Sequence, residues 1–393
     1  MMKHRKLIIT RFLFFIILPL LIWEMKIFYS QFKFSYMARD FVEYWAASRL
    51  LLTGNNPYSP EQLLAIQKSV GWEYETVLQV YCPPWIFIFF LPFCLLKYTL
   101  GKFVWFLFNL GLVFVCADWA WRFYGGPNYA RWCAPILSFT FIPTLFALKG
   151  GQISPIILVG LLGFLHFEKQ KKPLLAGIFT LLIAIKPQIL YLFWLAFLFW
   201  IVDRHKWSAL LGCLAALLIS LIIPFIYNAH IISQFISIIV NQSPAYLYVS
   251  HTIGAMLRLS FGSELHWLQF LPTILGTLWF PFYWRKHRNT WDWGQRIPFI
   301  IFMSLLTTFY GWQSEYIILL LPMLQIASLI IRAKHHNNFR LAIMLHLSIN
   351  CVALVIYDLW HYLMLLIIPP LFASYLILRK KVERENLSIS NSK

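Results

Sequence analysis

The chain has 393 residues, of which 60% are apolar, 19% are aromatic and only 12% are charged, whereas soluble domains carry about 25% charged residues. No globular core could bury this much apolar surface, which excludes a soluble enzyme, a disordered chain and a secreted disulfide scaffold. The apolar runs are continuous and do not alternate, which excludes the strands of an outer-membrane barrel. The composition predicts an all-α, polytopic membrane protein.

The net charge of +18 does not indicate nucleic-acid binding, because no basic stripe lies on a soluble domain. The positive residues instead form short clusters between apolar runs, a pattern that marks the cytoplasmic ends of membrane helices and favours anionic lipid headgroups. We therefore expect membrane lipids as partners and no nucleic acid. The clusters lie at 3–6, 169–172, 204–206, 285–288, 332–340 and 379–384.

The N-terminal apolar run at 7–29 resembles a signal peptide, but it is as long as a full span and no small-residue cleavage site follows it. We expect an uncleaved first helix with a cytoplasmic N-terminus. The polar segment 30–80, with nearly balanced charge, then lies outside the cytoplasm. The run 83–96 begins with two prolines and is too short to cross comfortably, so it is predicted to be re-entrant or interfacial.

We place the remaining apolar runs so that every basic cluster lies on the cytoplasmic side of the membrane. The predicted total is then about twelve spans, within a range of about ten to fourteen. Residues 1–380 are predicted to form one multi-pass domain that includes a first extracytoplasmic loop at 30–100. Residues 381–393 form a short cytoplasmic tail. The further spans are predicted near 102–124, 131–148, 152–168, 174–186, 188–202, 207–227, 266–284, 297–311, 316–331, 341–356 and 361–378.

In this threading the polar residues within apolar territory gather on the outer side of the membrane. Ionisable groups at membrane depth are costly and are functional candidates by default. Helix breaks at Gly150, Pro187 and Gly311 accompany them, and broken backbone at that depth requires a protein-lined or water-filled cavity. We expect an extracytoplasmic polar cavity there. The residues are Lys149 with Gln152, Lys186 with Gln188, Gln313 with Glu315, and Asp358 with His361.

The first loop begins with an expected amphipathic helix over 38–52, and Ser59 is predicted to cap a second one. Both are interpreted as short helices on the outer membrane surface. Arg39 and Glu43 have i, i+4 spacing and can form an ion pair. This leaves Asp40 as the carboxylate with no obvious neutralising partner. Asp40 is either a catalytic base or the N-cap of its own helix.

At these residues the sequence resembles family-87 glycosyltransferases, which include polyprenol-phosphate-mannose-dependent α-mannosyltransferases with the GT-C membrane fold. The resemblance extends over about residues 36–325 and departs from the family pattern at His251, where Gln is usual, and at Gln313–Glu315, where histidines are usual. The matching segments, in the family's order, are Asp40-Phe41-x-x-Tyr44, Leu52-x-Gly54-x-x-Pro57-Tyr58, Tyr81-x-Pro83-Pro84, Lys149-Gly150-Gly151-Gln152, Pro173 to Gly177, Lys186-Pro187-Gln188, Ser250 to Arg258, and Gly311 to Tyr316 with Pro322.

The resemblance implies transfer of a hexose, with mannose as the first candidate, from a polyprenyl-phosphate donor to an extracytoplasmic glycolipid or glycan. Asp40 is expected to deprotonate the acceptor hydroxyl on the face opposite the leaving phosphate, which implies inversion. We expect Lys186, Arg258 and Lys149 to bind the donor phosphate. The expected substrate-binding residues are Glu43, Tyr44, Gln152, Gln188, His251 and Glu315.

Structural interpretations of the same residues remain open. Lys186 could extend to the interface, Gln152 could satisfy a broken helix end, and Glu315 could pair with a nearby lysine. The sequence contains no DxD or HExxH motif, no glycine-rich phosphate loop and no Cys/His ligand spacing, so neither a metal nor another cofactor is expected.

Three alternatives remain at this stage. A related GT-C enzyme could use another lipid-phosphate sugar, such as arabinofuranose. A multi-pass secondary transporter would also have broken helices and buried lysines, and a non-catalytic assembly factor for envelope polymers would retain the helices. Frequent Lys, Ile, Phe and Asn suggest an AT-rich bacterial genome. We expect a location in the bacterial inner membrane, with cytoplasmic termini and an extracytoplasmic active site.

Overall fold

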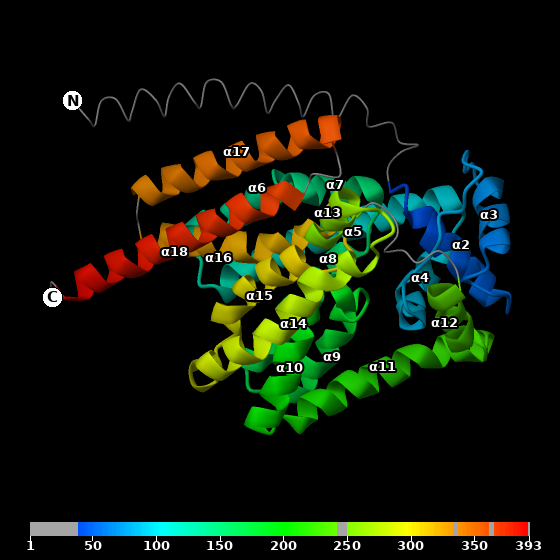
Figure 1. Ribbon diagram of the computed structural model, residues 1–393, viewed down its shortest axis with the longest axis horizontal. Coiled ribbons are helices and arrows are strands. Elements are labelled where there is room, and N and C mark those ends of the chain that lie inside the picture. The colour runs from blue at the N-terminus through cyan, green and yellow to red at the C-terminus, as the bar shows by residue number, and fades with distance from the viewer. Residues whose placement is uncertain (1–37, 242–249, 334–335, 361–364, 392–393) are drawn as a thin grey trace.

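The computed structural model describes residues 38–241, 250–333, 336–360 and 365–391, and these residues contain helices and no strand. The all-helical prediction is confirmed. Figure 1 shows a central group of helices with α2, α3, α4 and α12 gathered at one end and α17 and α18 along one side. The predicted first helix at 7–29 lies outside the described residues, as do the side chains of Asp358 and His361.

The α-helices and the short 3-10 helices (η) follow one another along the chain with few long connections. In chain order they are α2 Phe41–Leu52, α3 Pro60–Ser69, η2 Pro84–Ile86, α4 Phe87–Cys94, α5 Tyr98–Phe123, η3 Asn128–Ala130, α6 Cys133–Phe139, α7 Ile142–Gly150, α8 Ser154–Lys169, α9 Pro173–Ile183, η4 Pro187–Leu190, α10 Tyr191–Arg204, α11 Trp207–Tyr227, α12 Ile231–Asn241, α13 Ile253–Phe261, α14 Trp267–His287, η6 Arg288–Thr290, α15 Trp293–Thr307, η7 Gln313–Leu319, α16 Leu320–Arg332, α17 His336–Trp360 and α18 Ile368–Asn391.

Five helices of the described residues are long and apolar enough to cross a membrane, or six if the bent pair formed by Asn128–Phe139 and Ile142–Gly150 is counted as one span. The two parts of this pair meet at 61°. Helices lie at each further predicted span, but several are short, since α9 has 11 residues and α15 has 15. The chain is a polytopic membrane protein, and its total of about twelve spans stays a prediction.

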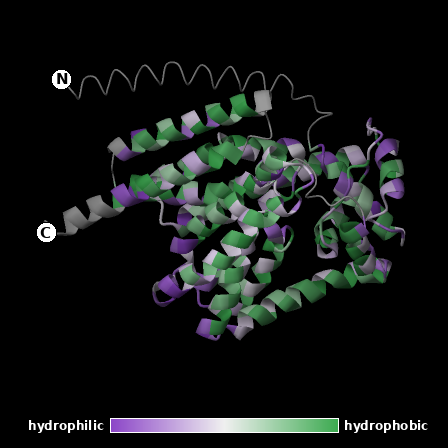
Figure 2. Cartoon of the chain, in the orientation of Figure 1, coloured by the Kyte–Doolittle hydropathy of each residue, from purple (hydrophilic) through white to green (hydrophobic). Residues whose placement is uncertain are grey.

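Hydropathy follows this arrangement, because hydrophobic residues cover the central helices while hydrophilic residues gather at the α10–α11 and α14–α15 turns and along α3 (Figure 2). Exposed apolar side chains such as Leu218 and Phe282 are normal on helices that face lipid. Their exposed fractions are 64% and 75%.

The buried apolar side chains form two clusters, which we name the main core and the arm core. The main core joins α5 to the helices between α6 and α18. The arm core joins α2 and α4 to the first half of α5, with Ile153 and Ile156 from the start of α8 and Ile231 and Ile238 from α12. Leu148 at the end of α7 still belongs to the main core. The segment between α7 and α8 therefore lies at the boundary of the two cores.

The first loop differs in one respect from the predicted pair of surface helices. Five of the ten residues of α3 are exposed. Ser59 is its N-cap, as expected, and the Ser59 hydroxyl accepts from the Gln62 N–H at 3.4 Å. α2, in contrast, is almost entirely buried against α4 and α5. Its apolar residues surround the helix, so it lacks the polar face of a surface helix. α4 has only eight residues, too few to cross a bilayer, as expected for a re-entrant or interfacial segment.

Candidate active site

The burial of α2 fixes the position of Asp40. Tyr44 of α2 stacks on Phe90 of α4 with ring centroids 4.4 Å apart, and the Trp45 indole N–H donates to the Leu96 carbonyl at 3.2 Å. Asp40 precedes the helix at the N-cap position, but its side chain makes no capping hydrogen bond. The interpretation of Asp40 as a simple helix cap is therefore wrong.

The predicted ion pair between Arg39 and Glu43 is also absent from the described residues. The Arg39 guanidinium instead lies over the rings of Trp72 and Tyr74, at 5.1 Å and 4.7 Å from their centroids. Glu43 hydrogen-bonds with Tyr44 and lies in the electrostatic range of Asp40. The aromatic pair attracts Arg39 away from the helix, which leaves Glu43 next to Asp40.

A close backbone approach joins α2 to the end of α7. The Asp40 N–H donates to the Gly150 carbonyl at 2.8 Å. Gly151 has a left-handed backbone with φ +67°, and a Cβ there would lie 2.6 Å from the Ala38 Cα, so this position requires glycine. The Trp105 indole N–H holds the Gly151 carbonyl at 2.7 Å. The glycine pair thus places the next residue, Gln152, beside Asp40.

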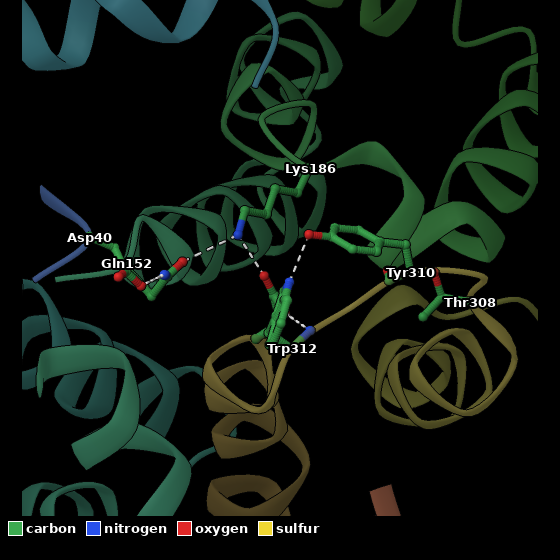
Figure 3. Close-up of polar contacts among 7 residues, drawn as sticks. Asp40, Gln152, Lys186, Thr308, Tyr310 and Trp312 are labelled. Carbon is green, nitrogen blue, oxygen red and sulfur yellow. Dashed lines mark hydrogen bonds and ion pairs between the residues drawn. The ribbon is translucent and has the colours of Figure 1, made fainter. Parts of the chain in front are cut away.

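Gln152 connects the carboxylate of Asp40 to the ammonium group of Lys186. Its amide nitrogen donates to Asp40 Oδ2, and its amide oxygen accepts from Lys186 Nζ at 3.3 Å. Because Lys186 can only donate and ionised Asp40 can only accept, these partners fix the orientation of the amide. Figure 3 shows the three side chains in a row.

Lys186 lies at the predicted helix break, since α9 ends at Ile183 and η4 begins at Pro187. Its Nζ forms an ion pair with Glu315 Oε1 at 2.5 Å, and the exposed fractions of the two side chains are 13% and 1%. The structural interpretation of Glu315, pairing with a lysine, is therefore observed. Lys186 is turned into the protein and does not extend toward the interface.

Glu315 belongs to η7, and its second oxygen accepts from the backbone N–H of Trp312. The Trp312 indole N–H in turn donates to the Tyr310 hydroxyl at 2.7 Å. These contacts extend one continuous hydrogen-bonded group from Asp40 through Gln152, Lys186, Glu315 and Trp312 to Tyr310 (Figure 3), which we name the polar cluster. Trp312 and Tyr310 were not among the predicted site residues, although the break at Gly311 lies between them, because aromatic residues are also common at membrane–water interfaces.

His251 reaches the edge of the polar cluster. Its backbone N–H donates to the Gly311 carbonyl at 2.9 Å, and its carbonyl accepts from the Tyr316 hydroxyl at 2.8 Å. Its ring centroid lies 5.2 Å from that of Trp312. His251 and Tyr316, which are 65 residues apart in the chain, thus join the loop before α13 to the η7 segment.

The other predicted site residues lie on neighbouring elements. Lys149 is half-buried in the last turn of α7, and Arg258 is buried on α13. Gln188 is half-buried on η4, where its backbone carbonyl accepts from the Thr308 hydroxyl at 2.9 Å. Tyr44 packs within the arm core. The predicted roles of these residues in binding the donor phosphate and the substrate stay predictions.

Electrostatics favour a basic carboxylate at this site. Burial raises the pKa of Asp40 above its ordinary value, although the hydrogen bond from Gln152 and the charge of Arg39 act in the opposite direction. Burial, with the negative charge of Asp40 next to it, raises the pKa of Glu43 to about 8. A carboxylate with a raised pKa is a better proton acceptor near neutral pH. Within the described residues, no three His, Cys, Asp or Glu side chains could hold a metal ion together.

Comparison with known protein families accounts for this arrangement. The model of glycosyltransferase family 87 matches residues 81–309, more than half of the chain. The chain belongs to glycosyltransferase family 87. No curated protein and no solved structure matches it. The family-87 match contains Gln152 and Lys186, whereas Asp40 and Glu315 lie outside it and are joined to it by the geometry described above. The protein is thus a membrane glycosyltransferase, which acts on a sugar donor and an acceptor.

Proposed function

We propose that this glycosyltransferase transfers a hexose, with mannose as the first candidate, from a polyprenyl-phosphate donor to a hydroxyl of an extracytoplasmic glycolipid or glycan. Asp40 acts as the general base and Lys186 stabilises the departing phosphate. The observation that carries this proposal is the connection of a half-buried carboxylate to a buried ammonium group through a single amide, Gln152. A membrane setting favours a donor that is itself anchored in lipid.

The chemistry requires few protein groups. A lipid phosphate monoester is a good leaving group, so transfer needs a base for the acceptor hydroxyl and positive charge for the leaving oxygen atoms. Asp40 supplies the base, and the raised pKa of its carboxyl strengthens it. Attack from the side of Asp40, opposite the phosphate, inverts the anomeric centre, so a β-linked donor gives an α-linked product.

Lys186 is the cation nearest to this base along the polar cluster. In the structure its charge is balanced by Glu315 at 2.5 Å. A donor phosphate that reaches Lys186 would share this ammonium group with Glu315, and the lysine has three hydrogens to donate. A fixed cation in a site of low dielectric stabilises developing negative charge strongly. We place the sugar next to His251 and Trp312, whose ring centroids lie 5.2 Å apart.

The test is sugar transfer by the purified protein in lipid vesicles, with a panel of radiolabelled polyprenyl-phosphate sugars and membrane extract as acceptor. Wild type and Asp40→Asn are compared, because asparagine preserves the size of the side chain and removes its basicity. We expect transfer from one donor and a loss of about 10²–10⁴-fold in the variant.

The matched control is Glu61→Gln, which changes an exposed carboxylate of the same loop on α3. It should transfer sugar at the wild-type rate. Transfer that survives Asp40→Asn would remove Asp40 as the base. Transfer from a nucleotide sugar, or from a lipid-phosphate arabinofuranose and no hexose, would overturn the proposed donor.

A further inference from the structure

A partly open space lies between α6, α16, α17 and α18, at the opposite end of the molecule from α2 (Figure 1). Its volume is about 220 Å³, and apolar side chains from all four helices line it, among them Ile136, Met323, Ala327, Ala342 and Leu371. We name it the apolar cavity. An apolar space of this kind stays dry, and its walls lack contacts that a hydrocarbon occupant would supply.

Two polar side chains in the wall, His346 and Tyr375, hydrogen-bond to partners within the protein. The His346 ring nitrogen Nε2 lies 2.9 Å from the Thr140 hydroxyl oxygen. The Tyr375 hydroxyl donates to Gln325 Oε1 at 2.7 Å. The cavity thus presents an apolar surface to an occupant. Such a surface excludes a sugar or a nucleotide and favours an acyl chain.

Two exposed arginines flank the residues that connect α16 to α17, and each is next in sequence to a lining residue of the apolar cavity. Arg332 ends α16 directly after the lining residue Ile331, and Arg340 of α17 directly follows the lining residue Phe339. None of the four ion pairs within the described part of the chain involves either arginine. Trp132, another lining residue, is 61% exposed, as is typical of a side chain at the membrane–water interface. The two arginines are suited to a negatively charged headgroup.

The outer wall of the cavity is loosely packed. The apolar part of α17, Asn338–Ile356, is only 22% buried within the protein, compared with 78% for Gln313–Arg332 of η7 and α16. α17 therefore faces lipid over most of its surface, and an acyl chain can enter beside it from the bilayer.

We propose that the apolar cavity binds one acyl chain of an anionic phospholipid, whose headgroup phosphate contacts Arg332 and Arg340. The lipid comes from the leaflet on the basic side of the membrane, which is the cytoplasmic leaflet in the predicted threading. It acts as a structural ligand that fills the gap between α17 and the main core. The site is separate from the polar cluster and does not depend on the proposed transfer reaction.

The experiment uses the full-length protein in phosphatidylcholine vesicles that contain phosphatidylglycerol with a diazirine near the end of one acyl chain. After illumination, the labelled peptides are located by mass spectrometry. We expect labels on α16 and α17 at the cavity. Ala327→Phe should reduce them at least about fivefold, because the added ring occupies the volume of the chain. The control Val352→Phe adds the same ring on α17 at a 46% exposed position outside the lining and should leave the labelling unchanged.

A second comparison tests the headgroup. Labelling by the phosphatidylglycerol probe should exceed that by a phosphatidylcholine probe with the same diazirine chain. The double variant Arg332→Gln with Arg340→Gln should remove this preference, because each arginine is expected to raise the ratio of the two labelling yields by about fivefold. Equal labelling by the two probes overturns the choice of an anionic lipid. Unchanged labelling in Ala327→Phe, or a crosslink from a photoreactive residue at position 342 to residues 1–37 of the same chain, overturns the site itself.

Discussion

The polar cluster and the apolar cavity both lie between helices of the same membrane protein, but their side chains differ in polarity and in how they are satisfied. In the polar cluster, the polar side chains hydrogen-bond to one another, so that Asp40, Gln152, Lys186 and Glu315 form one connected group. In the apolar cavity, two polar side chains of the wall hydrogen-bond to partners within the protein. Buried charges must be satisfied by one another, whereas an apolar space needs only hydrocarbon.

This difference predicts opposite responses to substitution. Removal of one member of the polar cluster leaves a buried charge without its partner, which is costly. Addition of carbon atoms to the wall of the apolar cavity replaces missing contacts, which is favourable when the new side chain fits. Substitutions in the first region should impair both activity and stability, and those in the second should leave activity intact.

The largest effect is expected from Lys186→Met, which removes the ammonium group and keeps the length of the side chain. Glu315, with 1% of its side chain exposed, then remains as an unpaired buried carboxylate. We expect a loss of about 3–5 kcal/mol in the free energy of unfolding and a loss of about 10²–10³-fold in kcat. Chemical denaturation in detergent and donor-transfer kinetics measure the two quantities.

The double variant Lys186→Met with Glu315→Leu separates structure from catalysis. Because it removes both charges, it should recover most of the stability that the single variant loses, yet transfer should stay as low as in Lys186→Met. Recovery of transfer in the double variant would show that Lys186 serves only to neutralise Glu315 and would remove it from the reaction.

A smaller effect is expected from Gln152→Leu, which keeps the two charged partners and removes the amide between them. Hydrogen bonds to charged groups contribute about 1.5–3 kcal/mol each, so kcat/KM should fall about tenfold to a hundredfold. The same change in the exposed Gln170, which directly follows α8, is the control and should have no effect. A fall in KM with unchanged kcat would contradict a role in positioning the base.

Much of the polar cluster could be predicted from the sequence, because charged residues within apolar runs are conspicuous. Gln152, Lys186 and Glu315 stand out as polar residues in such runs, and the breaks at Gly150, Pro187 and Gly311 accompany them. Asp40 lies in the polar first loop and was singled out by its lack of a neutralising partner and by the family resemblance. The helices within the described residues were also predictable from the lengths of the apolar runs, although their crossings were not.

Side-chain partners could not be predicted in the same way. Arg39 and Glu43 have the spacing of an ion pair, but Trp72 and Tyr74, more than thirty residues later along the chain, attract Arg39 instead. Trp312 and Tyr310 resemble interfacial aromatics until the fold places them beside Glu315. The apolar cavity has no sequence signal at all, because its lining residues are ordinary membrane-helix residues whose imperfect fit arises only on packing.

The neighbour of Asp40 offers a test of the electrostatics in the polar cluster. The pKa of Glu43 is raised to about 8 in the folded protein from an ordinary value of 4.5, so the folded state binds this proton more tightly than the unfolded chain does. The stability that Glu43 confers is therefore complete below pH 4.5 and is lost as the pH rises toward about 8. Glu43→Gln removes this dependence.

Between about pH 6 and about pH 9, the unfolding temperature of wild type should fall by a few degrees more than that of Glu43→Gln. Differential scanning fluorimetry over this range measures both proteins, and all other titrating groups are shared. Parallel curves for the two proteins would show that Glu43 is ionised at neutral pH.

The smallest effect is expected at the apolar cavity, from Ala342→Leu on α17. The three added carbon atoms point into a space of about 220 Å³, so we expect an increase of about 1 kcal/mol in the free energy of unfolding in detergent and no change in transfer. The gain should shrink when anionic phospholipid is added, because lipid and leucine compete for one volume. If the gain is the same with and without lipid, lipid does not occupy the apolar cavity, and the cavity differs from the polar cluster only in polarity. If it disappears with lipid, the cavity is a binding site, and its occupant stabilises the helix bundle without contributing to the chemistry at Asp40.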